Sequence, residues 1–357
     1  MKRFLVVTCV LLLCLCLLPA GVADAPAQEL TILFTHDLHS HVDTIAAKDG
    51  SEIGGFAKLK TVIDSVRAQD DAVLVVDAGD FAMGTLYQSV YAEEALELRL
   101  LGAMGFDATT YGNHEFDYGS NKLAEMLLSA KASGEPLPQL LVSNINWDGS
   151  TGEHTATLKA AMEAYGAKPY TVIERGGVRI ALFGLLGKDA DECAPTSGLD
   201  FADIIESAKQ TVATIKQNEQ ADMIVCLSHS GTDKDPSLSE DELLAAAVPE
   251  IDFIVSGHTH TTLANGIRVG DTMIGSVGEY GENIGKAVLQ KRADGRWDVT
   301  QYALIPIDES IVSDASMLET VAQYRTRICA YLEQFGYTSP DQVIAYSPYT
   351  FAADAEL

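Results

Sequence analysis

The chain has 357 residues, of which 47% are hydrophobic and 21% are charged, a composition typical of globular proteins and not of disordered ones. Its 51 acidic and 24 basic residues give a formal net charge of -27, which argues against binding of nucleic-acid polymers through a basic surface. An acidic surface also repels anionic substrates, so a phosphate site here needs local cations, which metal ions would supply.

Residues 1–25 have the pattern of a secretion signal peptide. Lys2 and Arg3 precede an apolar stretch from Phe4 to Leu18, and Ala23-Asp24-Ala25 fits a small-x-small cleavage site. A membrane anchor is the alternative, but the apolar run is short for a bilayer span. We therefore expect a secreted protein, periplasmic or at the cell surface, with no stable membrane insertion once the signal is removed.

Strand-like apolar runs then alternate with helix-like stretches along the chain. The predicted strands are Leu30–Thr35, Ala72–Val76, Ala108–Tyr111, Gln139–Asn144, Val178–Gly184, Asp222–Leu227, Asp252–Ser256, Thr272–Val277, Lys286–Lys291 and Trp297–Ile305. The predicted helices are Gly55–Gln69, Glu93–Met104, Asn121–Ala132, Asp203–Gln217 and Glu240–Val248. The early alternation predicts an α/β core, and the late strands with little helix between them predict antiparallel pairing. We expect two mixed sheets packed together and flanked by helices, a four-layer α/β/β/α sandwich.

The pattern changes after Pro306. A polar, turn-like stretch spans residues 308–314, and helical spacing of apolar residues then predicts a helix from Ala315 to about Phe335. Gly336 and Pro340 end it. The last residues, 341–357, begin a further segment that the chain does not finish.

Five short polar segments each close one of the apolar runs. They supply carboxylate, imidazole and amide groups, which suit divalent metal ions, and they follow strands, where open α/β sheets place ligand sites. Seven ligands hold two metal ions if one carboxylate bridges them, and a metal pair roughly 3.5–4 Å apart is suited to in-line attack at phosphorus. The segments are Asp37–His39, Gly79–Asp80, Gly112–Glu115, Ser228–His229 and Gly257–His260.

The individual positions agree with such a centre. Alternation in extended chain would point Asp37 and His39 to one side, so that they share one metal ion. Asp80 follows Gly79, which permits a tight turn, and its carboxylate can bridge two ions, although taken alone it equally fits a helix N-cap. Asn113 would be a neutral oxygen ligand.

Histidines supply the remaining groups. His229, His258 and His260 close strand-like runs, as metal ligands of this kind would. His114 can instead stabilise a phosphoryl group or protonate the leaving oxygen, and Asp117 can hold its imidazole in position. The other histidines, His36, His41 and His154, are interpreted as structural or supporting residues.

These residues resemble the calcineurin-like metallophosphatase domain of the secreted bacterial 5′-nucleotidases, a group that includes UDP-sugar hydrolases and 2′,3′-cyclic-nucleotide phosphodiesterases. The resemblance covers about residues 29–310 and is most specific at Asn113–Asp117. It depends on the segments Thr35–His39, Gly54–Ala57, Asp77–Asp80, Gly112–Asp117, Ser228–Gly231 and Gly257–His260.

The resemblance implies a division of these residues between two metal ions. Asp37, His39 and His260 would hold one ion, Asn113, His229 and His258 the other, and Asp80 would bridge. His114 and Asp117 would form a catalytic dyad. The ions would be Mn²⁺, Zn²⁺ or similar, and the family's fold is the same two-sheet sandwich.

The resemblance also divides the chain. Residues 1–25 would be the signal peptide, 26–310 the metallophosphoesterase domain, 311–340 a linker helix, and 341–357 the start of a C-terminal 5′-nucleotidase domain that is largely absent. Because that domain stacks the nucleobase in the family, no base-recognition residue is assigned.

The sequence thus predicts a secreted phosphohydrolase that releases phosphate from nucleotides through attack by a hydroxide formed between two metal ions. Two alternatives remain open, a secreted metal- or nucleotide-binding protein without catalysis, and a thiosulfate-ester hydrolase on the same fold. The presence of both His114 and Asp117 speaks against the first, because a binding protein has no need of a dyad.

Overall fold

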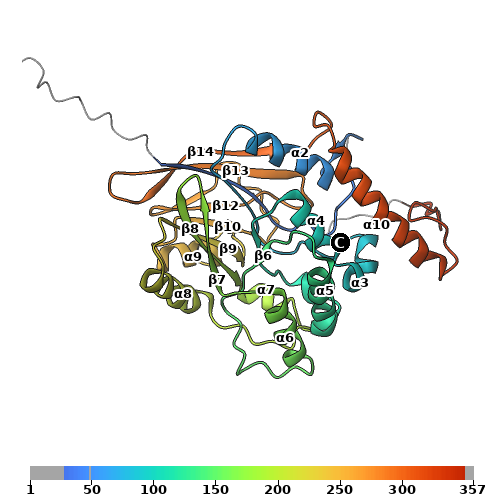
Figure 1. The fold of residues 1–357 in the computed structure, drawn as a ribbon, viewed down its shortest axis with the longest axis horizontal. Coiled ribbons are helices and arrows are strands. Elements are labelled where there is room, and N and C mark those ends of the chain that lie inside the picture. The colour runs from blue at the N-terminus through green and yellow to red at the C-terminus, as the bar shows by residue number, and fades with distance from the viewer. Residues whose placement is uncertain (1–27, 48–49, 350–357) are drawn as a thin grey trace, which may run out of the picture.

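The computed structural model describes residues 28–47 and 50–349, so the expected signal peptide at 1–25 lies outside the described residues. Two six-stranded sheets lie against each other, and helices cover both outer faces (Figure 1). The predicted α/β/β/α sandwich of two mixed sheets is confirmed.

The first sheet combines parallel and antiparallel strands. Its central strand β1 runs parallel to β4, and β5 and β6 continue the parallel order. On its other side β1 pairs antiparallel with β13, which pairs antiparallel with β14, as the late strands predicted. In spatial order the strands are β14 (Trp297–Pro306), β13 (Asn283–Lys291), β1 (Glu29–Thr35), β4 (Val73–Asp77), β5 (Ala108–Thr109) and β6 (Gln139–Leu140).

The second sheet is parallel at its centre and has an antiparallel strand at each edge. A separate two-stranded ribbon, β2 (Ile45–Ala46) and β3 (Glu52–Ile53), lies outside both sheets. The strands of the second sheet, in spatial order, are β11 (Ile267–Val269), β12 (Thr272–Gly275), β10 (Phe253–Ser256), β9 (Met223–His229), β8 (Val178–Leu186) and β7 (Tyr170–Arg175).

Side-chain alternation along the strands builds three apolar cores. In β1, Ile32 and Phe34 point into the core between the two sheets, whereas Leu33 points into the core beneath the helices. In β9, Val225 faces the inter-sheet core and Cys226 faces the helices of the second sheet. The central strands of each sheet are therefore buried on both faces, which explains why they read as continuous apolar runs.

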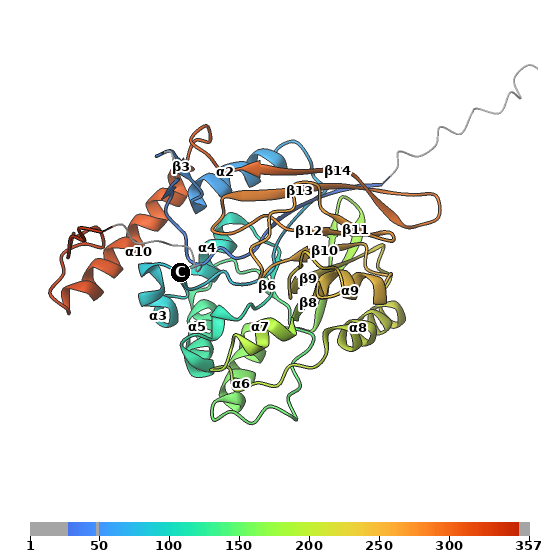
Figure 2. The same cartoon turned by 180° about the vertical axis from the view of Figure 1, so that it is seen from behind.

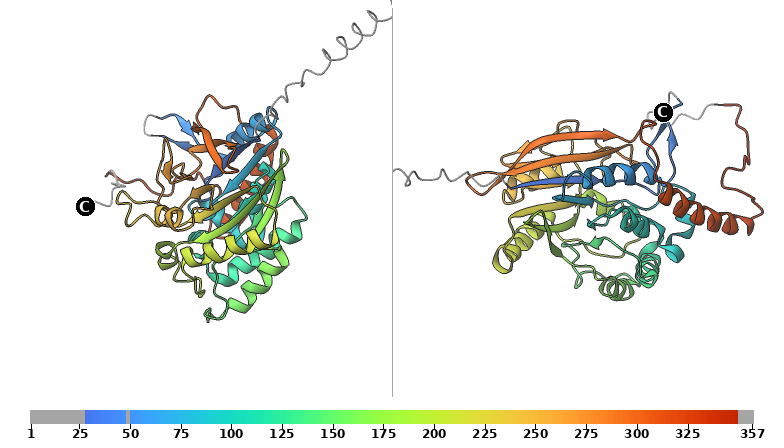
Figure 3. Two further views of the ribbon diagram at one scale, coloured as in Figure 1. Left: turned by 90° about the vertical axis from the view of Figure 1, so that its left-hand side faces the viewer. Right: turned by 45° about the horizontal axis from the view of Figure 1, so that its top comes forward.

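The helices divide between the two outer faces (Figures 1 and 2). Helix α10, which has four buried apolar residues, lies at the end of the molecule away from α8 and α9 (Figure 3). On the first sheet lie α2 (Phe56–Arg67), α3 (Tyr91–Glu94), α4 (Leu96–Met104), α5 (Gly119–Ser133), α6 (Thr155–Tyr165) and α10 (Ala315–Glu333). On the second lie α8 (Ile204–Asn218) and α9 (Glu240–Ala247), and the short α7 (Lys188–Glu192) follows β8.

Some elements differ from the sequence prediction. The helix expected over Glu93–Met104 is interrupted at Ala95, whose backbone is left-handed with a φ of 48°, so it forms α3 and α4 instead. Helix α6, helix α7 and the edge strand β7 were not predicted. The strands expected at Ala108–Tyr111 and Gln139–Asn144 pair over only two residues each, because the chain turns away to form loops.

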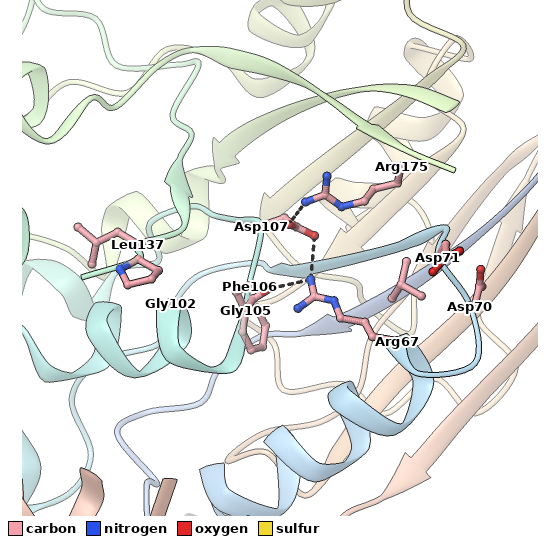
Figure 4. A pocket seen from close by; sticks show the side chains of 11 residues that line it. Arg67, Asp70, Asp71, Gly102, Gly105, Phe106, Asp107, Leu137 and Arg175 are labelled. Carbon is pink, nitrogen blue, oxygen red and sulfur yellow. Dashed lines mark hydrogen bonds and ion pairs between the residues drawn. The ribbon is translucent and has the colours of Figure 1, made fainter. Parts of the chain in front are cut away.

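One pocket of about 500 Å³ lies at the amino ends of β4 and β5 (Figure 4). Its two guanidinium groups, from Arg67 and Arg175, both bind the carboxylate of Asp107, which in turn accepts a hydrogen bond from the backbone N–H of Val75 at 2.9 Å. Asp107 thus links α2, β4 and β7, and its carboxylate offsets one of the two positive charges. The pocket is thus explained as a structural junction.

Across residues 28–47 and 50–349, no helix combines the length and the apolar character needed to cross a bilayer.

Candidate metal centre

The predicted site residues gather at the carboxyl edge of the sandwich. Those of the first sheet follow β1, β4 and β5, and those of the second close β9 or follow β10. Because parallel strands end at the same edge, residues far apart in the sequence meet there. The residues brought together are Asp37, His39, Asp80, Asn113, His114, His229, His258 and His260.

Their donor atoms form two groups that meet at one carboxylate, that of Asp80, which also lies within 4.8 Å of ligand atoms of His39 and His114. Asp37, His39 and His260 place one ligand atom each within 4.8 Å of one another, and Asp80, His229 and His258 do the same. Oδ2 of Asp80 lies 3.1 Å from Nε2 of His229 and 3.8 Å from Nε2 of His39. Asp80 therefore lies between the groups, where a shared ligand would be needed.

The backbone reaches this arrangement through an uncommon conformation. Five of these residues have φ between 46° and 78°, the left-handed region, namely Asp37, His39, Asp80, His258 and His260. Each such position costs roughly 1–3 kcal/mol and persists only where its surroundings enforce it, typically at functional sites. The expected extended alternation of Asp37 and His39 is thus wrong, and two left-handed residues bring these side chains together instead.

Three imidazoles are oriented by hydrogen bonds from their outer nitrogen. Nδ1 of His39 lies 3.1 Å from the carbonyl of Met83, and Nδ1 of His229 lies 2.8 Å from the carbonyl of Ala78. A carbonyl can only accept, so Nδ1 carries a proton in both rings and Nε2 is the nitrogen that faces the ligand groups. Nδ1 of His260 is bound by Glu279 in the same way. All three Nε2 atoms are therefore available to a cation.

His258 has the opposite orientation. Its Nε2 lies 2.9 Å from the carboxylate of Asp189, and its Nδ1 lies 3.0 Å from Oδ1 of Asn113. With the proton on Nε2, both Nδ1 and the amide oxygen present lone pairs to each other. Two acceptors this close suit a shared cation, which is the role that Asn113 and His258 were predicted to have.

His36, predicted to be structural or supporting, orients Asp37. Its Nε2 accepts a hydrogen bond from the backbone N–H of Val277 at 2.7 Å, so the proton lies on Nδ1, which donates to Oδ2 of Asp37 at 2.5 Å. The same Oδ2 accepts the backbone N–H of His258 at 2.9 Å. Burial opposes ionisation of Asp37, but the imidazoles of His260, His36 and His229 around its carboxylate outweigh this and hold the pKa of Asp37 well below its usual range.

The donor set fits divalent cations. Oδ1 of Asp37 and Nε2 of His229 are fully buried and lack a hydrogen-bond partner of suitable geometry, although Oδ1 lies 3.4 Å from Nε2 of His260 and Nε2 of His229 lies 3.1 Å from Oδ2 of Asp80. Leaving a buried polar atom unsatisfied costs about 1–3 kcal/mol, so such atoms call for a partner. A cation bound by each group would satisfy them, and the imidazole, carboxylate and amide ligands suit Zn²⁺ or Mn²⁺.

His114 and Asp117 form a half-exposed pair beside the ligand groups. Nδ1 of His114 lies 2.8 Å from Oδ2 of Asp117, and each side chain is 41% exposed. The backbone N–H of His114 donates to Oδ1 of Asp80 at 2.8 Å, and the His114 ring lies 5.0 Å from that of His39. With Nδ1 held by Asp117, Nε2 of His114 is the nitrogen available to a substrate.

Glu115 supports the site and received no role in the sequence analysis. Its buried carboxylate accepts the backbone N–H groups of Gly112 at 2.6 Å, Ala82 at 3.0 Å and Asp80 at 3.1 Å. It therefore joins the loop after β4 to the loop after β5. Its position inside the Gly112–Glu115 segment was the only sequence signal for this function.

The two remaining histidines do not contribute. His41 packs against Tyr280, with ring centroids 4.0 Å apart, and His154 immediately precedes α6. Neither belongs to the ligand groups found among the described residues.

A comparison with protein families decides the identity of this arrangement. Residues 30–262, which carry all seven predicted metal ligands, match the calcineurin-like phosphoesterase family. The chain belongs to this family. It is a family of metal-dependent phosphoric ester hydrolases, in agreement with the resemblance seen in the sequence.

Proteins similar to this phosphoesterase include nucleotidases. A trifunctional nucleotide phosphoesterase, YfkN of Bacillus subtilis, is 29% identical over 87% of this chain and 22% of its own length. A probable 5′-nucleotidase of Treponema pallidum is 30% identical over 80% of this chain and 46% of its own length. The crystal structure of a 5′-nucleotidase precursor from Thermus thermophilus shares the fold, with a TM-score of 0.69 and 24% identity over 86% of this chain and 60% of that one. The phosphoesterase thus spans about three fifths or less of each.

Proposed function

We propose that this phosphoesterase is a secreted, two-metal hydrolase that releases phosphate from nucleotides, in the manner of a 5′-nucleotidase. The observation that carries the proposal is the meeting of two ligand groups at Asp80, next to the exposed pair of His114 and Asp117. The groups provide for two cations, and the pair provides a proton donor at the solvent side.

We assign one ion to Asp37, His39 and His260, the other to Asn113, His229 and His258, and a bridging role to Asp80. Two divalent ions bound there would neutralise phosphoryl oxygens and lower the pKa of a water molecule toward neutrality. On a surface of net charge -27 they would also supply the attraction for an anionic substrate.

His114 has the catalytic role in this proposal. Asp117 holds Nδ1 of its imidazole, so Nε2 can donate a hydrogen bond to a phosphoryl oxygen or give a proton to the leaving ester oxygen. Both side chains are 41% exposed, which leaves room for a substrate to approach. A protein that only binds metal or nucleotide would not need an imidazole paired with a carboxylate at this place. The pair therefore favours catalysis over binding alone.

Nucleotides are the proposed substrates because the similar proteins include a nucleotide phosphoesterase and a probable 5′-nucleotidase. The catalytic unit in this proposal is the metallophosphoesterase domain, residues 26–310. Secretion follows from the signal-like pattern of residues 1–25.

The test is phosphate release by the mature chain, residues 26–357, with Mn²⁺ or Zn²⁺ and with a chelator. AMP is compared with 2′,3′-cyclic AMP, an aryl phosphate and a thiosulfate ester. His114→Ala is compared with His154→Ala, a histidine outside the ligand groups. Metal-dependent release from AMP that is lost only in the His114 variant supports the proposal. Bound metal without hydrolysis of any phosphate ester refutes it, and cleavage of the thiosulfate ester alone would assign that reaction instead.

A further inference from the structure

A third group of metal-binding side chains lies beside the centre. Its ligand atoms, from Asp189, Cys193 and His258, all lie within 4.8 Å of one another. Asp189 lies on α7, and Cys193, four residues later, caps the C-terminal end of that helix with a helical backbone, so both side chains lie on one face, toward the loop that carries His258. The Asp189 carboxylate already lies 2.9 Å from Nε2 of His258.

This third group is open to solvent. Cys193 is exposed, and the Asp189 side chain is 69% exposed, whereas that of His258 is 10% exposed. A pocket of about 290 Å³, lined by Asp189, Glu192 and Thr259 among others, opens next to it. An ion can therefore reach these ligands without entering the buried centre.

The ligand types separate this group from the main centre. The main centre offers carboxylate, imidazole and amide ligands and no thiol. A thiolate with an imidazole and a carboxylate favours a softer ion, such as Zn²⁺ or Cd²⁺, over Mn²⁺ or Mg²⁺. The group with the thiol should therefore prefer Cd²⁺ to Mn²⁺ more strongly than the main centre does.

We propose that Asp189, Cys193 and His258 form a third, inhibitory site for a soft divalent ion. Bonds form from the ion to the sulfur of Cys193, to Nε2 of His258 and to the carboxylate of Asp189. The thiol proton and the Nε2 proton pass to solvent, so the ion replaces the hydrogen bond between Asp189 and His258. The proposed function assigns Nδ1 of His258 to the main centre, so an ion bound at Nε2 perturbs a ligand of that centre and slows hydrolysis. The inhibitory role therefore rests on the proposed function.

Binding is tested without reference to activity. Cd²⁺ is added to the mature chain, residues 26–357, and the ultraviolet charge-transfer band of cadmium thiolate is recorded. Cys193→Ser is compared with Cys329→Ser, because Cys329 is the other partly accessible thiol and Cys226 is buried. The band should appear in the parent and in the Cys329 variant and be absent in the Cys193 variant. A missing band in the parent, or a band that survives Cys193→Ser, overturns the site.

Inhibition is then measured in the presence of saturating Mn²⁺, with each variant's rate expressed relative to its own rate without Cd²⁺. Loss of partners that only support metal ligands already costs roughly 10–100-fold in metal affinity, so Cys193→Ser should raise the half-inhibitory Cd²⁺ concentration at least about tenfold. The Cys329 variant should match the parent. Equal inhibition of all three overturns the inhibitory role. Absence of any phosphatase activity would refute the proposed function, and the thiolate band would still report on the site.

Discussion

Replacing Glu115 by Gln should destabilise the protein through the two loops that it joins. All three groups that face its carboxylate are backbone N–H donors, from Gly112, Ala82 and Asp80. Burial and the charge of Asp80 raise the pKa of Glu115 well above its usual range, which opposes ionisation. A protonated carboxyl group would have an O–H with no acceptor near it, because all its neighbours are N–H donors. The hydrogen bonds therefore favour the ionised form and oppose the effect of burial.

The size of the effect follows from these bonds. Oε2 of Glu115 accepts two N–H groups and Oε1 accepts one. A glutamine amide would keep its oxygen at the position of Oε2 and place its NH₂ group against the N–H of Ala82, so that two donors face each other. A hydrogen bond to a charged group contributes about 1.5–3 kcal/mol, and an unsatisfied buried donor costs about 1–3 kcal/mol. We therefore expect the free energy of unfolding to fall by about 2–4 kcal/mol.

Urea unfolding of the parent and of Glu115→Gln, followed by circular dichroism in the presence of chelator, measures this difference. Glu93→Gln, at an exposed glutamate, is the matched control and should change little. A loss below about 1 kcal/mol for Glu115→Gln would mean that Glu115 is protonated in the folded protein, since an amide then replaces a neutral acid of the same shape. That result would refute the claim that an ionised Glu115 joins the loops after β4 and β5.

Four further substitutions are expected to be informative. His114→Ala should retain bound metal but reduce turnover by about 10²–10⁴-fold, whereas Asp80→Asn should lose metal; both are measured by metal analysis and phosphate release. Gly112→Ala should also lose metal, because a Cβ there would overlap the carboxylate of Asp80. Burial raises the pKa of Glu97 to about 7. The folded state then binds more protons at Glu97 than the unfolded state does between about pH 4.5 and 7. The contribution of Glu97 to the free energy of unfolding is therefore fully present below about pH 4.5 and is lost as the pH rises through 7. Glu97→Gln should remove about 3 kcal/mol of this pH dependence in urea titrations of chelated protein.

Much of the fold could be predicted because both sheets are buried on both faces. Their central strands read as apolar runs, and the polar segments that end them were visible for the same reason. The edge strand β7 was missed because its residues, Tyr170–Arg175, are mostly half-buried and lack such a run. The break at Ala95 was missed because alanine favours helix, and only its tertiary surroundings hold it in a left-handed conformation.

The supporting residues were harder to predict than the proposed ligands. His36 was predicted to be structural or supporting, but its task could not be predicted because its partner Val277 lies 241 residues further along the chain, just after β12 of the other sheet. Glu115 could not be assigned because its partners are backbone N–H groups, which leave no mark in the sequence. Asp189 lies on α7, a helix that was not predicted. Side-chain type thus indicated the candidate metal ligands and catalytic residues, but not the residues that position them.

The buried carboxylates explain how the strained loops are maintained. Asp77, at the end of β4, accepts the hydroxyls of Thr35 and Thr109 at 2.8 and 2.9 Å and the N–H of Gly79 at 3.0 Å. Asp77 therefore links the carboxyl ends of β1, β4 and β5, which precede the ligand loops. Glu115 joins the loops that follow β4 and β5. Left-handed positions such as Asp80 persist only when their surroundings enforce them, and these acceptors are the groups placed to do so. The geometry of the centre thus depends on buried carboxyl groups that lie outside the ligand groups.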